Sequence, residues 1–301
     1  MNDHPSSIAQ YYAYGQRLLC PTYSLDEVRL ILRQLLAEAL DLCDTEVLLL
    51  DGERRLIPEH RTQLMQWLER LALGEPLQYV LGYTHFYGEP ICVVPGVLIP
   101  RPETEELVEM IVASIPTTSS ATVQVLDVGT GSGCIPCSLA VAWGERLRAE
   151  AWDISEEALG VAKDNFATFA QRTGAKLEAQ LMDLFAAPSP WRYEPFDIIV
   201  SNPPYIHPSE ATEMAPNVLE YEPHLALFAP ETDPIAYYDA LASLITKGYL
   251  APNGQMYVEI NPLYALETLE RMSHIVGEEL GSARIVTDLS GKERFIHLKT
   301  T

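Results

Sequence analysis

The apolar positions between residues 24 and 73 recur at helical spacing. Ser24 and Glu27 form a capping box, which is a signature of a helix N-terminus. The apolar positions after it lie three or four residues apart, first at Val28, Ile31, Leu32, Leu35 and Leu36, then at Leu64, Trp67, Leu68 and Leu71. This pattern predicts a small all-helical domain within residues 1–81, although residues 1–23 show no periodicity from which we predict a structure.

The pattern changes between Gly82 and Pro100, where glycine and proline interrupt short aromatic and β-branched runs. Such runs predict a hairpin-like connector rather than a helix. Pro102 then stands where the first turn of a helix tolerates proline, so we predict a helix through residues 105–113. Residues 116–121 form a short polar linker. We therefore assign residues 82–121 to a connector with a linking helix.

Strand and helix patterns alternate from residue 122 to residue 301. Strands are predicted at residues 123–128, 150–154, 176–182, 196–201, 255–260, 283–287 and 294–298, with helices from about residue 135 and at residues 156–171, 235–246 and 264–275. This alternation is typical of an α/β domain, in which helices cover both faces of a mostly parallel sheet. The last two strands are joined by a short segment, which favours an antiparallel pair.

The composition is that of an ordinary globular protein, with 48% hydrophobic and 21% charged residues. No apolar run reaches the roughly 18 residues of a membrane-spanning helix. Residues 1–10 lack the pattern of a secretory signal, so we expect a cytoplasmic protein with no membrane partner. Five scattered cysteines favour free thiols over disulfides. Cys134 and Cys137 form a CxxC without a second metal-binding pair, which favours two buried helical positions and predicts no metal site.

The net charge of −22, from 42 acidic and 20 basic residues, limits the kind of partner. Its field repels polyanions and attracts basic surfaces. Enzymes that act on nucleic acids usually carry a basic stripe, whereas the longest Lys/Arg run here is Arg54-Arg55. The charge therefore favours a basic protein partner and argues against direct nucleic-acid binding.

A glycine-dense turn follows the predicted strand at residues 123–128. Its members are Gly129, Thr130, Gly131, Ser132 and Gly133. Ligands of an open α/β sheet bind beyond the carboxyl ends of the strands, where glycine lets the backbone approach them. Asp127 precedes the turn, and Asp153 ends the next strand, where a carboxylate accepts both hydroxyls of a ribose.

This combination resembles the cofactor site of Rossmann-like methyltransferases, with Asp127 near the methionine end of S-adenosylmethionine and Asp153 on the ribose. A tight turn beside a strand-end acid is the simpler alternative, and a nicotinamide-dependent reductase is a less favoured one. Asp183, which ends the third predicted strand, allows two interpretations: it contacts the adenine amino group, or it caps the following turn. The residues alone leave both open.

The predicted strand at residues 196–201 delivers Asn202-Pro203-Pro204-Tyr205 to the same edge of the sheet. Two prolines fix two φ angles and remove two N–H donors, which leaves nearby carbonyls to accept other bonds. Methylation of a planar nitrogen requires acceptors that hold the NH₂ group in line with the sulfonium methyl. The Asn202 side-chain oxygen and the Pro203 carbonyl supply these acceptors, and Tyr205 stacks on the target. The alternative is a turn that merely ends the strand beside a packed aromatic ring.

Further motifs point to a family. They are Gly74-Glu75-Pro76-Leu77-Gln78-Tyr79, the connector Leu98-Ile99-Pro100-Arg101-Pro102-Glu103-Thr104-Glu105, Tyr221-Glu222-Pro223 and Gly291-Lys292-Glu293-Arg294-Phe295. Over about residues 24–300 the chain resembles the PrmC/HemK family of peptide chain release factor glutamine methyltransferases. The connector is more specific than the glycine loop or the NPPY segment, which several kinds of methyltransferase share.

The resemblance implies a Rossmann-like catalytic domain at residues 122–301, with a seven-stranded, mostly parallel sheet whose last strand is antiparallel, preceded by a helical substrate-recognition domain. It implies methyl transfer from S-adenosylmethionine to the side-chain N5 of the glutamine in the Gly-Gly-Gln motif of a class 1 release factor, with S-adenosylhomocysteine as product. Cofactor contacts carry over to residues 129–133, Asp153 and Asn202, and substrate contacts to residues 202–205, Pro204 among them. Some members place a tryptophan after the third-strand acid, where this chain has Leu184, so its adenine contact would be apolar packing.

Two other functions are alternatives. An adenine-N6 methyltransferase acting on DNA or RNA presents the same geometric problem to the NPPY segment, but the acidic charge and the lack of a target-recognition insertion argue against it. A catalytically silent binding module is disfavoured because the chain keeps Asp127, Gly129, Gly131, Asp153 and Asn202. We expect a monomer.

We predict that Asn202→Ala loses most turnover. The barrier should rise by about 2–4 kcal/mol, as for other preorganised hydrogen-bond partners of a transition state. Steady-state methyl transfer to a Gly-Gly-Gln peptide measures the effect, and unchanged turnover would contradict the role of Asn202.

Overall fold

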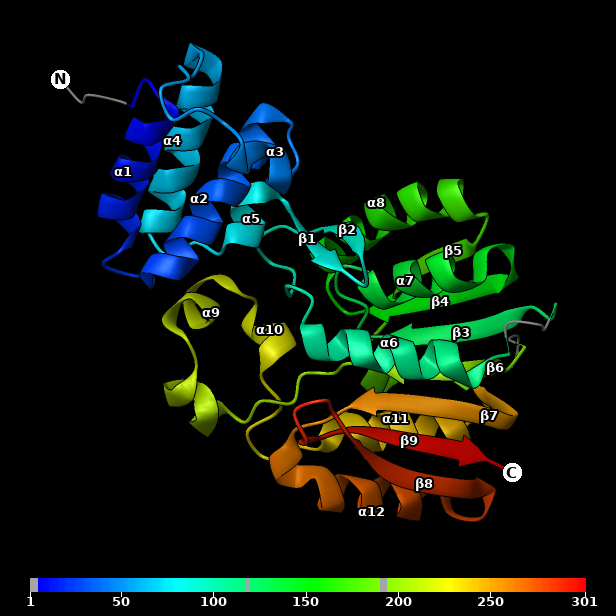
Figure 1. The fold of residues 1–301 in the computed structure, drawn as a ribbon. Helices are drawn as coiled ribbons and strands as arrows, with labels where there is room; N and C mark the ends of the chain where they lie inside the picture. The colour runs from blue at the N-terminus through cyan, green and yellow to red at the C-terminus, as the bar shows by residue number, and fades with distance from the viewer. Residues whose placement is uncertain (1–4, 117–119, 190–193) are drawn as a thin grey trace. The chain divides into compact units, whose positions relative to one another are not determined.

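The computed structural model describes residues 5–116, 120–189 and 194–301. The linker predicted at residues 116–121 therefore lies partly outside the described residues. Contacts divide the chain into two compact units, Met1–Gly82 with Pro216–Tyr221, and Tyr83–Ala215 with Glu222–Thr301 (Figure 1). In the described part of the chain, no helix combines the length and apolar character needed to cross a membrane.

The first unit is helical, as the sequence predicts. Its helices are α1 (Ile8–Leu19), α2 (Leu25–Leu40), α3 (Asp44–Leu48), α4 (Pro58–Ala72), α5 (Leu77–Leu81) and α9 (Pro216–Tyr221). The capping box of α2 is confirmed, since the Ser24 N–H donates to Glu27 Oε2 over 2.9 Å and the Glu27 N–H donates to Ser24 Oγ over 3.3 Å. The apolar faces of α1, α2 and α4 share one core.

Helix α1 falls within residues 1–23, for which we predicted no structure. Its buried positions are Ile8, Tyr11, Gly15 and Leu19. Only Ile8 and Leu19 of these four are aliphatic, so the aliphatic residues alone are too few to show a helical spacing. Gly15 is needed because a side chain there would collide with Leu32 of α2.

The second unit contains a seven-stranded sheet with strand order β5-β4-β3-β6-β7-β9-β8. The strands are β3 (Val123–Val128), β4 (Leu147–Asp153), β5 (Lys176–Leu181), β6 (Phe196–Ser201), β7 (Leu250–Glu259), β8 (Leu280–Thr287) and β9 (Glu293–Thr300). Strand β9 runs antiparallel to both β7 and β8, whereas the other pairings are parallel. This confirms the predicted α/β sheet and its antiparallel last strand.

Helices cover both faces of this sheet (Figure 1). One face packs against α6 (Pro102–Ser114), α7 (Cys134–Trp143) and α8 (Glu156–Thr173), and the other against α11 (Ala236–Thr246) and α12 (Ala265–Val276). Alternate residues of one strand serve the two cores: Val125 of β3 faces the first helix group and Leu126 the second. Strands buried on both faces explain why the sequence shows apolar runs there.

A two-stranded hairpin, β1 (Tyr83–Phe86) and β2 (Glu89–Cys92), precedes α6. Tyr87 and Gly88 make its turn with φ values of 52° and 77°. Such a turn matches the twist of paired strands. The Tyr87 N–H donates to Glu105 Oε1 of α6 over 3.0 Å. The hairpin and α6 both belong to the second unit.

Some elements differ from the prediction. Strand β7 begins at Leu250, whereas the prediction began at residue 255. The prediction began late because Pro252-Asn253-Gly254 has the composition of a turn. The strand accommodates these residues through an irregularity in its pairing with β6. Short helical segments without a long periodic pattern were not predicted. These include α9, α10 (His224–Leu227) and the 3₁₀ segments Gly144–Arg146, Leu184–Ala186, Pro208–Glu213, Pro262–Tyr264 and Gly277–Glu279.

We predict that Gly133→Ala destabilises the protein more than Gly131→Ala. Both glycines have positive φ, so alanine costs about 1–2 kcal/mol at either position. A Cβ at Gly133 would in addition lie 2.5 Å from the Phe166 ring, whereas none of the described atoms lies within 4 Å at Gly131. The overlap adds about 1–3 kcal/mol. Urea unfolding compares the two variants, and equal losses would contradict the packing explanation.

Candidate active site

A cavity of about 320 Å³ lies in the second unit at the carboxyl ends of strands β3, β4, β5 and β6. This volume is within the range of small-molecule sites. The cavity brings together most of the residues predicted from sequence: Gly129, Thr130, Gly131, Ser132, Asp153, Asp183, Leu184, Asn202, Pro203 and Pro204. Three predicted residues, Asp127, Gly133 and Tyr205, are not part of its lining.

The glycine loop is held by the end of the neighbouring strand. The N–H groups of Gly129 and Thr130 donate to the Trp152 carbonyl over 2.8 and 3.0 Å. The Gly131 N–H donates to Asp153 Oδ2 over 2.9 Å. The loop glycines all have positive φ, and a Cβ on Gly129 would lie 4.0 Å from the Asn202 carbonyl oxygen. The loop therefore brings its backbone up to the exit of β6.

Asp127 is completely buried beneath the loop. Its Oδ2 accepts a hydrogen bond from Thr130 Oγ1 over 2.6 Å, and within the described residues its Oδ1 has no hydrogen-bond partner. Burial is the main cause that raises the pKa of Asp127 to about 7, against the lowering effect of the Thr130 hydrogen bond. An unpaired buried acceptor is costly, so this position fits a ligand that brings positive charge or a donor.

The two strand-end acids are anchored differently. Asp153 accepts from the Gly131 N–H and, through Oδ1, from the Ser155 N–H over 2.9 Å. Burial raises its pKa. Asp183 Oδ1 accepts from the Phe185 N–H over 2.9 Å, so the residue caps the turn at Leu184–Ala186 while also lining the cavity. The geometry is compatible with both interpretations of Asp183.

An aromatic pair beside Leu184 was not predicted. Phe185 and Tyr237 both line the cavity, and their ring centroids are 5.2 Å apart at an interplanar angle of 47°. Phe185 is 53% exposed, so its ring is accessible from the cavity that it lines. No motif signals the pair, because Tyr237 arrives from α11, far away in sequence.

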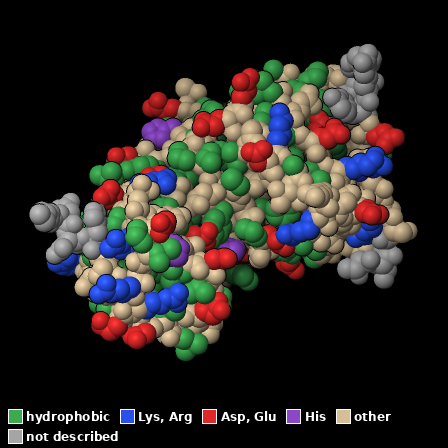
Figure 2. Space-filling model, turned by 90° about the horizontal axis from the view of Figure 1, so that it is seen from above, with side chains coloured by type: hydrophobic (Ala, Val, Ile, Leu, Met, Phe, Trp, Pro, Cys, Tyr) green, Lys and Arg blue, Asp and Glu red, His purple; other side chains and the backbone are tan. Residues whose placement is uncertain are grey.

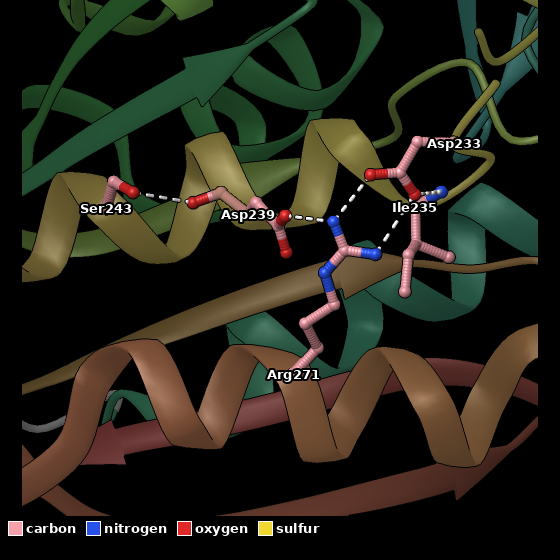
Figure 3. A network of polar contacts seen from close by, with 5 residues as sticks. All are labelled: Asp233, Ile235, Asp239, Ser243 and Arg271. Atoms are coloured by element: carbon pink, nitrogen blue, oxygen red, sulfur yellow. Dashed lines mark hydrogen bonds and ion pairs between the residues drawn. The ribbon is translucent and has the colours of Figure 1, made fainter.

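An ion-pair network fixes the beginning of α11, where Tyr237 lies. The Arg271 guanidinium of α12 donates to Asp233 Oδ1 over 3.0 Å and to Asp233 Oδ2 over 2.5 Å, and it also contacts Asp239 (Figure 3). The hydrogen bond from Arg271 holds the pKa of Asp233 below its ordinary value. Arg271 thus joins α12 to the segment that carries the cavity wall.

The NPPY segment joins a buried polar chain. Asn202 Nδ2 donates to Thr104 Oγ1 over 3.0 Å, and Thr104 Oγ1 donates to Glu259 Oε2 over 2.8 Å. Tyr205 donates its hydroxyl to Glu259 Oε1 over 3.0 Å. Burial raises the pKa of Tyr205 well above its usual range, so the hydroxyl stays protonated. Glu259, at the end of β7, was not predicted; a single acid at a strand end carries no motif.

Residues near the end of β7 also hold the exit of the segment. Asn261 Nδ2 donates to the Tyr205 carbonyl over 3.1 Å and to Glu210 Oε1 over 2.9 Å. Ile206 then forms a parallel bridge with Phe228. The turn is therefore built rigidly on both sides of the two prolines.

The specific connector meets the Tyr-Glu-Pro motif. Glu222 is 4% exposed and accepts from the Ile99 N–H over 3.2 Å and from Arg101 Nη2 over 2.7 Å. Arg101 lies at the N-terminus of α6 and lines the cavity. The connector and the Tyr-Glu-Pro motif are thus joined by an ion pair between partly exposed Arg101 and buried Glu222, a contact that no spacing along the chain predicts.

The two cysteines of the CxxC occupy buried positions on a helix, as the sequence predicts. Cys134 and Cys137 are buried on α7. Burial raises the pKa of Cys134 to about 12 and that of Cys137 higher still. A thiol with so high a pKa is a poor nucleophile and metal ligand.

Comparison with known proteins identifies the family of the chain. The family model for the Methyltransferase small domain matches residues 104–222, and that for the PrmC N-terminal domain matches residues 10–82. The release factor glutamine methyltransferase of Bacteroides thetaiotaomicron is 42% identical over 227 residues, covering 75% of this chain and 77% of the relative. That of Leptospira interrogans is 36% identical and covers 98% and 99% of the two chains.

The chain belongs to the release factor glutamine methyltransferase family. The match to the PrmC N-terminal domain begins at residue 10, so the family likeness includes most of α1, which the sequence analysis placed outside it. The hMettl16 catalytic domain, solved in complex with a 3′UTR hairpin, is similar in fold with a TM-score of 0.51 and 14% identity, covering 83% of this chain and 84% of that one.

We predict that stability falls as pH rises from about 4 to about 7, in part because of Asp127 and Glu259. Burial raises the pKa of each to about 7, from ordinary values of 3.8 and 4.5. The native state therefore binds more protons than the unfolded state between these values, and the stabilisation present at low pH is lost through pH 7.

Urea unfolding across this pH range measures the slope. Asp127→Asn and Glu259→Gln remove one titration each and should flatten it. Asp164→Asn, at an exposed position of α8, is the control for substitution of a surface carboxylate. A variant with the wild-type slope would contradict the raised pKa of that residue.

Proposed function

We propose that this chain transfers a methyl group from S-adenosylmethionine to the side-chain N5 of the glutamine in the Gly-Gly-Gln motif of a class 1 peptide chain release factor. Family membership supports the reaction class, because the similar relatives are named release factor glutamine methyltransferases. The observation that carries the proposal is the position of Asn202. Its side chain lines the cavity beside the glycine loop and is held in one orientation by Thr104.

The cavity residues fit the cofactor. Asp153 lines the cavity at the end of β4, where we assign the ribose. Asp127 lies beneath the loop, outside the lining, and we assign its unpaired carboxyl a supporting role near the cationic methionine end. Leu184, with Phe185 and Tyr237, provides an apolar and aromatic wall for adenine in place of the tryptophan of some family members. When bound, the cofactor supplies an electrophilic methyl on a sulfonium centre and leaves as a neutral thioether.

The residues of the chain position the acceptor nitrogen. The Asn202 Oδ1 and the Pro203 carbonyl accept the two amide hydrogens of the glutamine, which aims the nitrogen at the methyl group. The N–C bond forms as the S–C bond breaks, and the nitrogen then loses one proton to solvent. Tyr205 lies outside the cavity lining with its hydroxyl fixed on Glu259, so it supports the turn that carries Asn202 and Pro203. Positioning contributes most of the rate because no strong base is required before transfer.

The acidic charge of the chain favours a basic protein as the substrate. The formal charge is −22, and on the face drawn in Figure 2 the Lys and Arg side chains lie singly or in small groups among acidic and apolar ones. This distribution does not favour the alternative, an adenine-N6 methyltransferase with a nucleic-acid substrate. The likeness to hMettl16 concerns the fold alone.

We predict that the enzyme and S-adenosylmethionine together add about 14 Da, one methyl group in place of hydrogen, to a Gly-Gly-Gln peptide from a class 1 release factor. Tandem mass spectrometry locates the methyl group on the glutamine side chain. A matched Gly-Gly-Glu peptide, which lacks the NH₂ group, should gain nothing.

Binding and specificity controls accompany this assay. S-adenosylhomocysteine should raise the unfolding temperature by mass action; no shift would contradict the cofactor assignment. Methylation of an adenine-containing oligonucleotide but not of the peptide would overturn the proposed substrate in favour of the alternative.

A further inference from the structure

The buried chain Asn202–Thr104–Glu259 has a direction, because a hydroxyl owns one hydrogen. Thr104 is 2% exposed and Glu259 is fully buried. An ionised Glu259 only accepts, so the Thr104 hydroxyl hydrogen points to Glu259 Oε2, 2.8 Å away. The Thr104 oxygen is then left to accept, and it faces the NH₂ group of Asn202 at 3.0 Å. The amide oxygen of Asn202 must therefore point away from Thr104.

We propose that Thr104 and Glu259 are positioning residues for methyl transfer: they fix the Asn202 carboxamide so that its oxygen, not its nitrogen, is presented to the substrate amide. This inference rests on the function proposed above. An asparagine turned the other way would present donors to a substrate NH₂ group, and the acceptor site would be lost. A free side-chain amide has no strong preference between the two orientations, since they are nearly identical in shape.

Glu259 is itself held on several sides. Tyr205 donates to Oε1 over 3.0 Å, and Tyr238 donates to the Glu259 main-chain carbonyl over 3.0 Å. Both carboxylate oxygens thus receive a hydrogen bond, which favours the ionised form in a buried place. The same carboxylate consequently orients two residues of the NPPY segment, Asn202 through Thr104 and Tyr205 directly.

The orientation depends on the ionisation of Glu259. A protonated carboxyl could donate to Thr104, whose hydrogen would then turn to Asn202 and reverse the amide. Burial is the largest influence and raises the pKa of Glu259 to about 7. The hydrogen bonds from Thr104 and Tyr205 and the charge of Arg294 lower this pKa, and the charge of Glu103 raises it. The asparagine therefore presents its oxygen when Glu259 is ionised, a state that is populated as pH rises through about 7.

The test compares Thr104→Val, which keeps the shape and removes the hydroxyl, with Thr104→Ser, which keeps the hydroxyl. Thr104→Val should lower kcat for the Gly-Gly-Gln peptide by roughly 10- to 100-fold, by analogy with groups that orient metal ligands. KM for the peptide should change little, and Thr104→Ser should restore most of the turnover. In an Asn202→Ala background Thr104→Val should have almost no further effect, because Thr104 acts through Asn202.

A merely structural role gives a different result. Loss of packing would lower turnover by the same factor in both backgrounds, and that outcome would overturn the inference. So would wild-type kcat in Thr104→Val. Urea unfolding and the thermal shift with S-adenosylhomocysteine verify that each variant is folded and binds the cofactor.

An activity-free measurement separates this inference from the proposed function. In protein labelled with ¹⁵N-asparagine, the Asn202 NH₂ signals are identified by their loss in Asn202→Ala. One of the two hydrogens should exchange slowly with solvent in the wild type and in Thr104→Ser, but quickly in Thr104→Val and in Glu259→Ala. Equal exchange in all of these proteins would overturn the role of Thr104 and Glu259 in orienting Asn202. A wild type that shows this protection but does not methylate the peptide would overturn only the proposed function.

Discussion

The buried carboxylate of Glu259 is the interaction on which the active site depends. It joins three parts of the second unit that are far apart in sequence: the first turn of α6 through Thr104, the exit of β6 through Tyr205, and the end of β7 on which it stands. Burying a carboxylate without partners is very costly, so each of these parts is constrained to supply its donor. A polar group inside an apolar sheet edge here specifies geometry more than it contributes stability.

The surrounding sheet makes that geometry possible. Parallel strands end at a common edge, and the order β4-β3-β6-β7 places the ends of four strands side by side. The glycine loop follows β3, Asp153 ends β4, Asn202 follows β6 and Glu259 ends β7. The residues that we propose for cofactor and substrate binding therefore lie at the ends of adjacent strands, which are held together by main-chain hydrogen bonds.

Local rules account for much of the fold and of the cofactor site. Alternating strand and helix patterns identified the sheet, and the capping box at Ser24 identified the start of α2. The glycine loop was predictable because turns with positive φ favour glycine, so such a turn is visible in the sequence. In the structure its three glycines do adopt positive φ. The short elements between residues 208 and 228 were missed because capping and remote contacts, not periodicity, hold them.

The sequence by itself determined the α/β architecture, the glycine turn with its flanking acids and the Asn202–Tyr205 segment, because each depends on neighbours within a few residues. Only the tertiary structure decided that Thr104 meets Asn202 across 98 residues and Glu259 across 155. It also decided that Arg101 pairs with Glu222 and that Phe185 meets Tyr237. The physical reason is that a hydrogen bond between remote side chains imposes no spacing along the chain, so it is visible only once strand order has brought the partners together.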